Sequence, residues 1–311
     1  MNLSSLNQSR ILSKTTANEP FYANRMPSVH ARALPFKGTF NYVQSSFWVD
    51  DVFLSTATRW PSVTTGVTIG HQTMVGMSME DPPDLVFNGH VVERPALTIG
   101  AHNSEYWASE GAPWTSVIAI FPANMTARGW PDARSLHLVV AVTPEDIASL
   151  RALMLSLFST ASLSPEIFDV ATAVAGMRES IYLAYDRAFS RADEPVRNPV
   201  NVRHYQLMRR LDALLDANVG RPIYTDDIVA ELNVTARTLH TVTQRASGLS
   251  LHRYLRLKRL WSVRWALMAN PDRAIKNVAL DHGFWHLGRF AVEYKRMFGE
   301  APSQTARTRP N

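Results

Sequence analysis

The sequence of 311 residues contains no cysteine. Its absence excludes disulfide bonds, thiolate metal sites and cysteine nucleophiles. No uninterrupted apolar run reaches about 18 residues, so no membrane-spanning helix is expected. Residues 1–20 are polar and lack the apolar segment of a secretory signal. We therefore expect a cytoplasmic protein with no membrane association.

Common catalytic and metal-binding patterns are also missing. The chain has no His-x-His pair and no Gly-x-Ser-x-Gly turn. Four histidines of the first half could suggest a metal site, but they stand singly, at His71, His90, His102 and His137. A metal site needs several such ligands at matching spacing. The sequence thus predicts no metal, no cofactor and no enzymatic activity.

Charge is unevenly distributed along a chain long enough for roughly two domains. Residues 1–196 carry 13 Lys and Arg against 18 Asp and Glu, a net charge of −5. Residues 197–311 carry 19 against 9, a net charge of +10. The cations of this second segment are nearly all arginines, which suit bidentate contacts with phosphate and guanine. Such asymmetry indicates a polyanion-binding module, although a solvated basic surface has the same composition.

Residues 30–142 are predicted to be β-rich, after a flexible arm at 1–29. Short runs of Val, Thr, Phe and Trp alternate with Gly, Pro, Asn and Asp, which indicates a small barrel or sandwich. At Thr143-Pro144 the period changes to that of helices. Residues 143–190 are predicted to form a helical hairpin whose apolar stripes are either core or a dimer seam. Residues 191–203 contain Pro195 and Pro199 and are predicted to be a linker.

Residues 204–311 are predicted to be all helical and to contain two helix-turn-helix units. In the first unit Thr225 is predicted to cap a short helix, Asn233 marks the turn and Thr235 is predicted to cap the second helix. In the second unit Gly283 marks the corresponding turn. A long helix over 250–269 separates the units. Short helices at a tight turn, with a polar outer face on the second, are typical of DNA-binding motifs.

Both units carry an ordered set of apolar and turn residues: Ile228 to Gln244, Gly248, Tyr254-Leu255, Arg259-Leu260, Ile275, Val278-Ala279, Gly283-Phe284, Phe290, Tyr294-Lys295, Phe298-Gly299 and Pro302. In this spacing residues 205–306 resemble the DNA-binding domain of AraC/XylS transcriptional regulators. The stretch from Gly283 to Ser303 is similar to the ethanolamine-utilisation regulator branch of that family. The resemblance implies two helix-turn-helix subdomains joined by the long helix.

The resemblance also implies which residues contact double-stranded DNA. In the first unit these are the helix cap and four residues of its outer face: Thr235, Arg237, His240, Thr241 and Gln244. In the second unit they are His286, Leu287, Gly288, Arg289 and Val292. Phosphate contacts are expected from Arg256, Arg259 and Lys295.

The second unit departs from the family pattern. Val292 stands where an arginine is usual, and His286 replaces the usual Ser or Thr cap. Hydrogen-bonded reading of bases by this unit is therefore expected to be weaker. Leu287 and Val292 are expected to touch thymine methyl groups, and Arg289 to reach a base or a phosphate.

For the N-terminal half, the resemblance implies a cupin-like β-barrel that binds a small-molecule effector or mediates homodimerisation. Glu105, Tyr106 and Trp107 are predicted to lie in a loop at the barrel mouth and to contact the effector. The tryptophans of this half are either pocket lining or ordinary core. The family also implies an activator that contacts RNA polymerase.

The whole chain is thus expected to be an α+β two-domain protein and an effector-responsive transcriptional regulator. Two alternatives remain open. One is a cupin-like enzyme fused to a DNA-binding tail, which a convergent His/carboxylate cluster would favour. The other is a ligand-free dimeric DNA-binding protein, which a filled barrel would favour.

Overall fold

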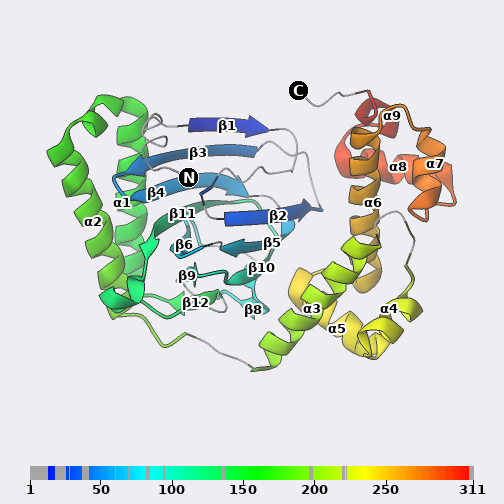
Figure 1. Ribbon diagram of the computed structural model, residues 1–311, viewed down its shortest axis with the longest axis horizontal. Helices are drawn as coiled ribbons and strands as arrows, with labels where there is room; N and C mark the ends of the chain where they lie inside the picture. The colour runs from blue at the N-terminus through cyan, green and yellow to red at the C-terminus, as the bar shows by residue number, and fades with distance from the viewer. Residues whose placement is uncertain are drawn as a thin grey trace. The chain divides into compact units, whose positions relative to one another are not determined.

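The computed structural model describes residues 13–17, 26–27, 29–36, 42–59, 61–68, 70–81, 85–93, 95–134, 137–195, 199–218, 221 and 223–307. The chain folds into two compact units. Unit 1 comprises Met1–Ala33, Phe40–Trp60 and Thr64–Arg197. Unit 2 comprises Leu34–Thr39, Pro61–Val63 and Asn198–Asn311. Most strands lie in the first unit and helices α3 to α9 in the second (Figure 1).

A seven-stranded sheet forms the centre of unit 1. Its order is β1 (Ser13–Ala17), β3 (Tyr42–Val49), β4 (Val52–Arg59), β11 (Trp114–Ala123), β6 (Gln72–Ser78), β9 (Ala96–Ala101) and β12 (Leu138–Ala141). Along β11, Ile118 and Ile120 belong to one hydrophobic cluster, whereas Ala119 and Phe121 belong to another. This alternation buries both faces of the sheet, because successive side chains point to opposite faces.

The second sheet has five strands. Its order is β2 (Val29–Pro35), β5 (Ser62–Thr68), β10 (Glu105–Glu110), β7 (Leu85–Phe87) and β8 (His90–Val91). Phe87 and Tyr106 of this sheet pack with Phe53 and Met74 of the larger one. The described strands thus form two sheets packed face to face, in place of the closed cupin-like barrel that we expected.

Two long helices cover the other face of the large sheet (Figure 1). They are α1 (Pro144–Leu163) and α2 (Ala171–Ser190), linked by the 3₁₀ helix η3 (Pro165–Asp169); another, η2 (Met125–Arg128), precedes β12. Thr143 caps α1 by accepting from the Asp146 backbone N–H at 3.1 Å, as the sequence predicts. Buried Asp146 pairs with Arg187 Nε of α2 at 2.9 Å and fixes the hairpin.

Helix α1 is long and apolar enough to cross a membrane by length and composition alone. Its inner side chains Leu150, Met154 and Leu157 are buried in the core of unit 1, as in a helix of a soluble core. Its outer side is unusual, since Leu155 is 63% exposed. Leu163 and, on α2, Leu183 are exposed as well. The hairpin therefore presents apolar side chains on its outer face.

Unit 2 consists mainly of helices. They are α3 (Pro199–Ala217), α4 (Thr225–Leu232), α5 (Ala236–Ser247), α6 (Leu251–Ala269), α7 (Ile275–Asp281), α8 (Leu287–Phe298) and α9 (Pro302–Thr305). Helix α3 begins within the segment 191–203 that the sequence predicts as a linker, and β1 lies within the predicted arm at 1–29. Residues 1–12, 18–25, 28 and 196–198 lie outside the described residues.

A buried histidine joins several segments of unit 1. His137 Nδ1 lies 3.1 Å from Ser104 Oγ, and its Nε2 lies 3.4 Å from Thr68 Oγ1. A Cβ on Gly100 would lie 2.0 Å from the imidazole ring, so only glycine permits this approach. Burial lowers the pKa of His137 from 6.5 to about 3, against a smaller opposing effect of its hydrogen bond to Ser104.

We predict that His137 makes the stability of the chain depend on pH between about 6.5 and about 3. Below pH 6.5 the unfolded chain binds a proton at this site that the folded chain excludes. The free energy of unfolding should therefore fall as the pH falls, by up to about 1.4 kcal/mol per pH unit from this group. Urea unfolding at pH 7.5 and 5 measures it.

The comparison variant His137→Gln removes the titrating group. Its stability should be lower at pH 7.5 but should decline less between pH 7.5 and 5 than that of the parent chain. His30→Gln, at an exposed position, should keep the parent's decline. Equal declines in all three proteins would contradict the assignment.

Candidate nucleic-acid interface

The first helix-turn-helix unit is formed by α4 and α5. Asn233 between them adopts φ 52° and ψ 52°, the left-handed region that asparagine tolerates. Tyr224, not Thr225, is the cap of α4, and its backbone N–H donates to Asp227 Oδ2 at 3.1 Å. Thr235 caps α5 as predicted, accepting from the Thr238 N–H at 3.1 Å. The unit thus has the tight turn and the capped second helix that the motif requires.

Helix α5 presents a polar outer face. Leu239, Val242 and Ala246 are buried, whereas the residues predicted to read DNA are all exposed: Thr235, Arg237, His240, Thr241 and Gln244. The Gln244 amide donates to the Gly248 carbonyl at 3.0 Å at the end of the helix. The structure therefore brings the predicted reading residues onto one solvent-facing side of α5.

The second unit is formed by α7 and α8, joined through Gly283 at φ 79°. His286 occupies the cap position of α8, and its side chain makes no capping hydrogen bond. Gly288, Arg289 and Val292 are exposed, but Leu287 is partly buried against the core of this unit. Leu287 therefore packs against the core of this unit and also lies near the predicted reading face.

A shared carboxylate holds the predicted cations of the second unit. Glu293 accepts from Arg289 Nε at 2.9 Å through Oε1 and from Arg256 Nε at 2.6 Å through Oε2. Burial alone would raise the pKa of Glu293, but the hydrogen bonds and charges of the two arginines outweigh it and lower this pKa. The sequence indicated these arginines as DNA contacts but gave no sign that they share one acid.

The three predicted phosphate contacts differ in their surroundings. Lys295 is exposed at the end of α8. Arg256 is bound to Glu293, and Arg259 is half-buried and donates to the Ile223 carbonyl at 2.7 Å. A phosphate contact by either arginine would have to compete with these partners. Lys295 therefore meets the geometric requirement best.

Helix α6 carries both units, because α5 packs on it and so do α7 and α9. Ser250 caps it by accepting from the Arg253 N–H at 3.4 Å. Its 19 residues span about 28 Å at about 1.5 Å per residue. This length places the two reading helices at separate positions along one rigid element.

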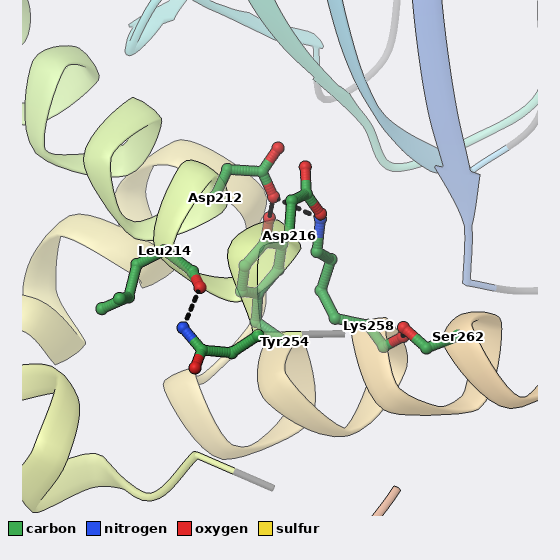
Figure 2. A network of polar contacts seen from close by, with 7 residues as sticks. Asp212, Leu214, Asp216, Tyr254, Lys258 and Ser262 are labelled. Atoms are coloured by element: carbon green, nitrogen blue, oxygen red, sulfur yellow. Dashed lines mark hydrogen bonds and ion pairs between the residues drawn. The ribbon is translucent and has the colours of Figure 1, made fainter. Parts of the chain in front are cut away.

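A buried ion-pair network fixes α6 to α3 (Figure 2). Lys258 Nζ of α6 lies 2.6 Å from Asp212 Oδ1 and 2.8 Å from Asp216 Oδ1, both on α3. The hydroxyl of Tyr254 also donates to Asp212 Oδ1, at 2.8 Å. The Lys258 side chain is only 6% exposed. Such burial fits the two aspartate partners, since lysine is rarely buried without a partner.

Unit 1 contains a cavity of about 60 Å³ between its two sheets. Tyr106, Phe87 and Met74 line it, together with Glu110 and Trp114. The predicted effector contacts Glu105, Tyr106 and Trp107 lie in strand β10, not in a loop, and β10 is hydrogen-bonded between β5 and β7 in the smaller sheet. Only Tyr106 of these three lines the cavity, and Trp107 is buried elsewhere.

The comparison with protein families agrees with the geometry of unit 2. The model described as "Helix-turn-helix domain" matches residues 228–308, which contain α5 to α9 in full. Residues 228–308 are thus similar to a helix-turn-helix domain.

Several proteins similar to this segment are named as transcriptional activators. The XylDLEGF operon transcriptional activator 2 of Pseudomonas putida is 38% identical over 99 residues, 31% of this chain and 62% of that protein. The XylDLEGF operon transcriptional activator of the same organism is 35% identical over 101 residues, 32% of this chain and 31% of that protein. RhaS, an HTH-type transcriptional activator of Klebsiella pneumoniae (strain 342), is 27% identical over 95 residues, 30% of this chain and 34% of that protein.

Solved structures show a fainter likeness that extends beyond the helix-turn-helix domain. The AraC-like transcriptional activator CuxR has 12% sequence identity and a TM-score of 0.43, over 80% of this chain and 94% of that chain. ToxT from Vibrio cholerae has 15% identity and a TM-score of 0.30, over 83% of this chain and 98% of that chain. At these TM-scores neither likeness bears on function.

We predict that the Lys258 network is essential for the stability of unit 2. Lys258→Ala leaves the buried Asp212 carboxylate without its cation and should cost about 3–5 kcal/mol of unfolding free energy. Denaturant unfolding of the full chain measures this. The matched variant Asp216→Asn removes the more exposed partner, whose side chain is 36% exposed, and should cost less than about 1 kcal/mol. Equal losses in both variants would contradict the prediction.

Proposed function

We propose that the chain is a sequence-specific DNA-binding transcriptional regulator of the AraC/XylS family. The observation that supports this most directly is the exposed polar face of α5, held by a capped helix inside the helix-turn-helix domain. The net charge of +10 over residues 197–311 suits the phosphate backbone. Similarity to activators over this domain favours activation and contact with RNA polymerase. This function also predicts a cytoplasmic location.

The two reading helices are proposed to enter adjacent major-groove segments. Successive segments on one side of DNA lie about 34 Å, or about 10 base pairs, apart. The rigid span of α6, about 28 Å, is of the same order. The outer face of α5 reads bases through Arg237, His240 and Thr241, with Thr235 and Gln244 at its edges. The outer face of α8 is proposed to carry His286, Leu287, Gly288, Arg289 and Val292 against the second segment. Lys295, and Arg256 and Arg259 where they exchange partners, are proposed to contact phosphate.

We predict that Arg237→Ala weakens binding of the full chain to its preferred DNA by about 1–3 kcal/mol and relaxes the preference at one base pair. Selection from random duplexes, followed by titration, measures both quantities. Affinity should also fall steeply as salt rises, because phosphate contacts release counterions.

The control for this variant is Arg203→Ala, which removes an exposed arginine of α3 outside residues 228–308. It should leave the base preference unchanged. A relaxed preference in the control, or an unchanged one in Arg237→Ala, would contradict the role of Arg237.

Unit 1 is proposed to bind a small-molecule effector in the cavity between its sheets. Apolar side chains such as Met74, Phe87 and Ile118 form most of its wall. Within the described part of the chain, the indole N–H of Trp114 has no hydrogen-bond partner although it is buried. A small, largely apolar molecule with a hydrogen-bond acceptor suits this wall.

We predict that such a ligand raises the thermal stability of the full chain. At a concentration of about 100 times its dissociation constant, the gain is about 2.7 kcal/mol by mass action. Thermal scans against small amines, amino alcohols and aromatic acids test this. Trp114→Phe keeps an aromatic ring, although a smaller one, and removes the N–H donor, so it should reduce the shift. Trp48→Phe, outside the cavity wall, should not.

The proposal also includes a homodimer formed by the outer face of the α1–α2 hairpin. Leu155, Leu163 and Leu183 are exposed there, and exposed apolar patches mark interfaces. Sedimentation of the full chain tests this part, and a monomer at micromolar concentration would contradict it.

For the enzyme alternative, no group of three His, Cys, Asp or Glu able to hold a metal occurs among the described residues.

A further inference from the structure

The outer face of α8 differs in chemistry from that of α5. Val292 is 69% exposed, and Trp285, just before the helix cap, is 62% exposed. Gly288 lies one turn before Val292 on the same side of the helix, since residues four apart are neighbours. The described part of α5 has no large exposed apolar side chain on its reading side. The two units therefore offer DNA different surfaces.

Gly288 serves no evident purpose within the protein itself. It is the second residue of α8, and a Cβ built on it would meet no atom within 4 Å. Its backbone is not in the left-handed region. Glycine costs a helix about 0.5–1 kcal/mol relative to alanine. A missing side chain at an exposed position, with no internal neighbour, leaves the helix backbone open to close approach by a partner.

The positive charge of Arg289, which follows Gly288 in α8, is partly neutralised by an ion pair. Arg289 Nε lies 2.9 Å from Glu293 Oε1, and the other oxygen of Glu293 is bound by Arg256. Glu293 lies one turn further along α8, so the ion pair runs along the helix. The groups that remain beside Gly288 are therefore mainly apolar.

We propose that Gly288, Val292 and Trp285 form an apolar surface that recognises the C5-methyl groups of thymine in one half of the DNA site. This inference rests on the proposed function. On the major-groove edges of the bases, the thymine methyl is the apolar group, whereas the other groups there are hydrogen-bond donors and acceptors. Gly288 lets the helix approach the bases, Val292 covers a methyl group, and Trp285 covers the neighbouring edge.

The test uses the full chain and its selected DNA site, in which each thymine is replaced in turn by uracil. This replacement removes only the methyl group and keeps the base pair. In the half-site bound by α8, loss of a covered methyl should weaken binding about fourfold. Replacements in the half-site bound by α5, assigned by its altered preference in Arg237→Ala, should have little effect.

Two variants connect the effect to these residues. Val292→Ala should abolish the sensitivity to uracil at one position, because the methyl no longer has a partner. Gly288→Ala should keep or raise the melting temperature, yet weaken DNA binding several-fold, because the added methyl blocks close approach. Ser303→Ala, a small change at an exposed position of α9, should change neither property.

The outcomes separate this inference from the proposed function. Selective DNA binding with no effect of uracil at any position, or with an unchanged effect in Val292→Ala, would overturn the methyl-recognition surface and leave the proposed function standing. A selected half-site without thymine would do the same. Absence of sequence-selective binding by the full chain would overturn both.

Discussion

The arrangement of unit 2 depends on one buried cation. Lys258 is buried with its ammonium group against Asp212 and Asp216, which lie one turn apart on α3. A slip of α3 by one turn, about 5.4 Å, would bring one carboxylate to the place of the other and leave Lys258 with one of these two partners. Burial of charge makes such a mismatch costly. The two aspartates therefore favour one register between α3 and α6, and with it the position of α5, which packs on both helices.

The two helix-turn-helix units share one backbone geometry but present different side chains. Both place a second helix after a turn with a positive φ, at Asn233 and at Gly283. The first offers side chains that donate and accept hydrogen bonds, whereas the second offers a bare backbone, a valine and a restrained arginine. A site read by both would combine hydrogen-bonded and methyl-based discrimination within one protein of modest size.

Local patterns in the sequence predicted the helical half well. The caps Thr143, Thr235 and Ser250 and the turn at Asn233 are decided by residues within one helical turn, so they can be read directly from the chain. The partners of Lys258 and Glu293 could not, because α6 meets α3 and α8 only after folding. In unit 1, the apolar residues from Phe47 to Leu54 are not one strand, because Asp50 at φ 54° turns the chain between β3 and β4. The split into two sheets likewise depends on long-range pairing, which strand patterns alone do not specify.

The contact between Gly100 and His137 constrains which substitutions unit 1 can accept in evolution. Any side chain at residue 100 would occupy space that the imidazole already fills, so substitution there must follow the loss of the ring. Replacement of His137 by a smaller residue would first open a void between Ser104 and Thr68, which lowers stability. A side chain at residue 100 would then fill that void and restore part of the stability. Substitutions at the two positions are therefore tolerated only in this order, first at residue 137 and then at residue 100. A chain with both substitutions would lack the buried histidine and keep its two sheets.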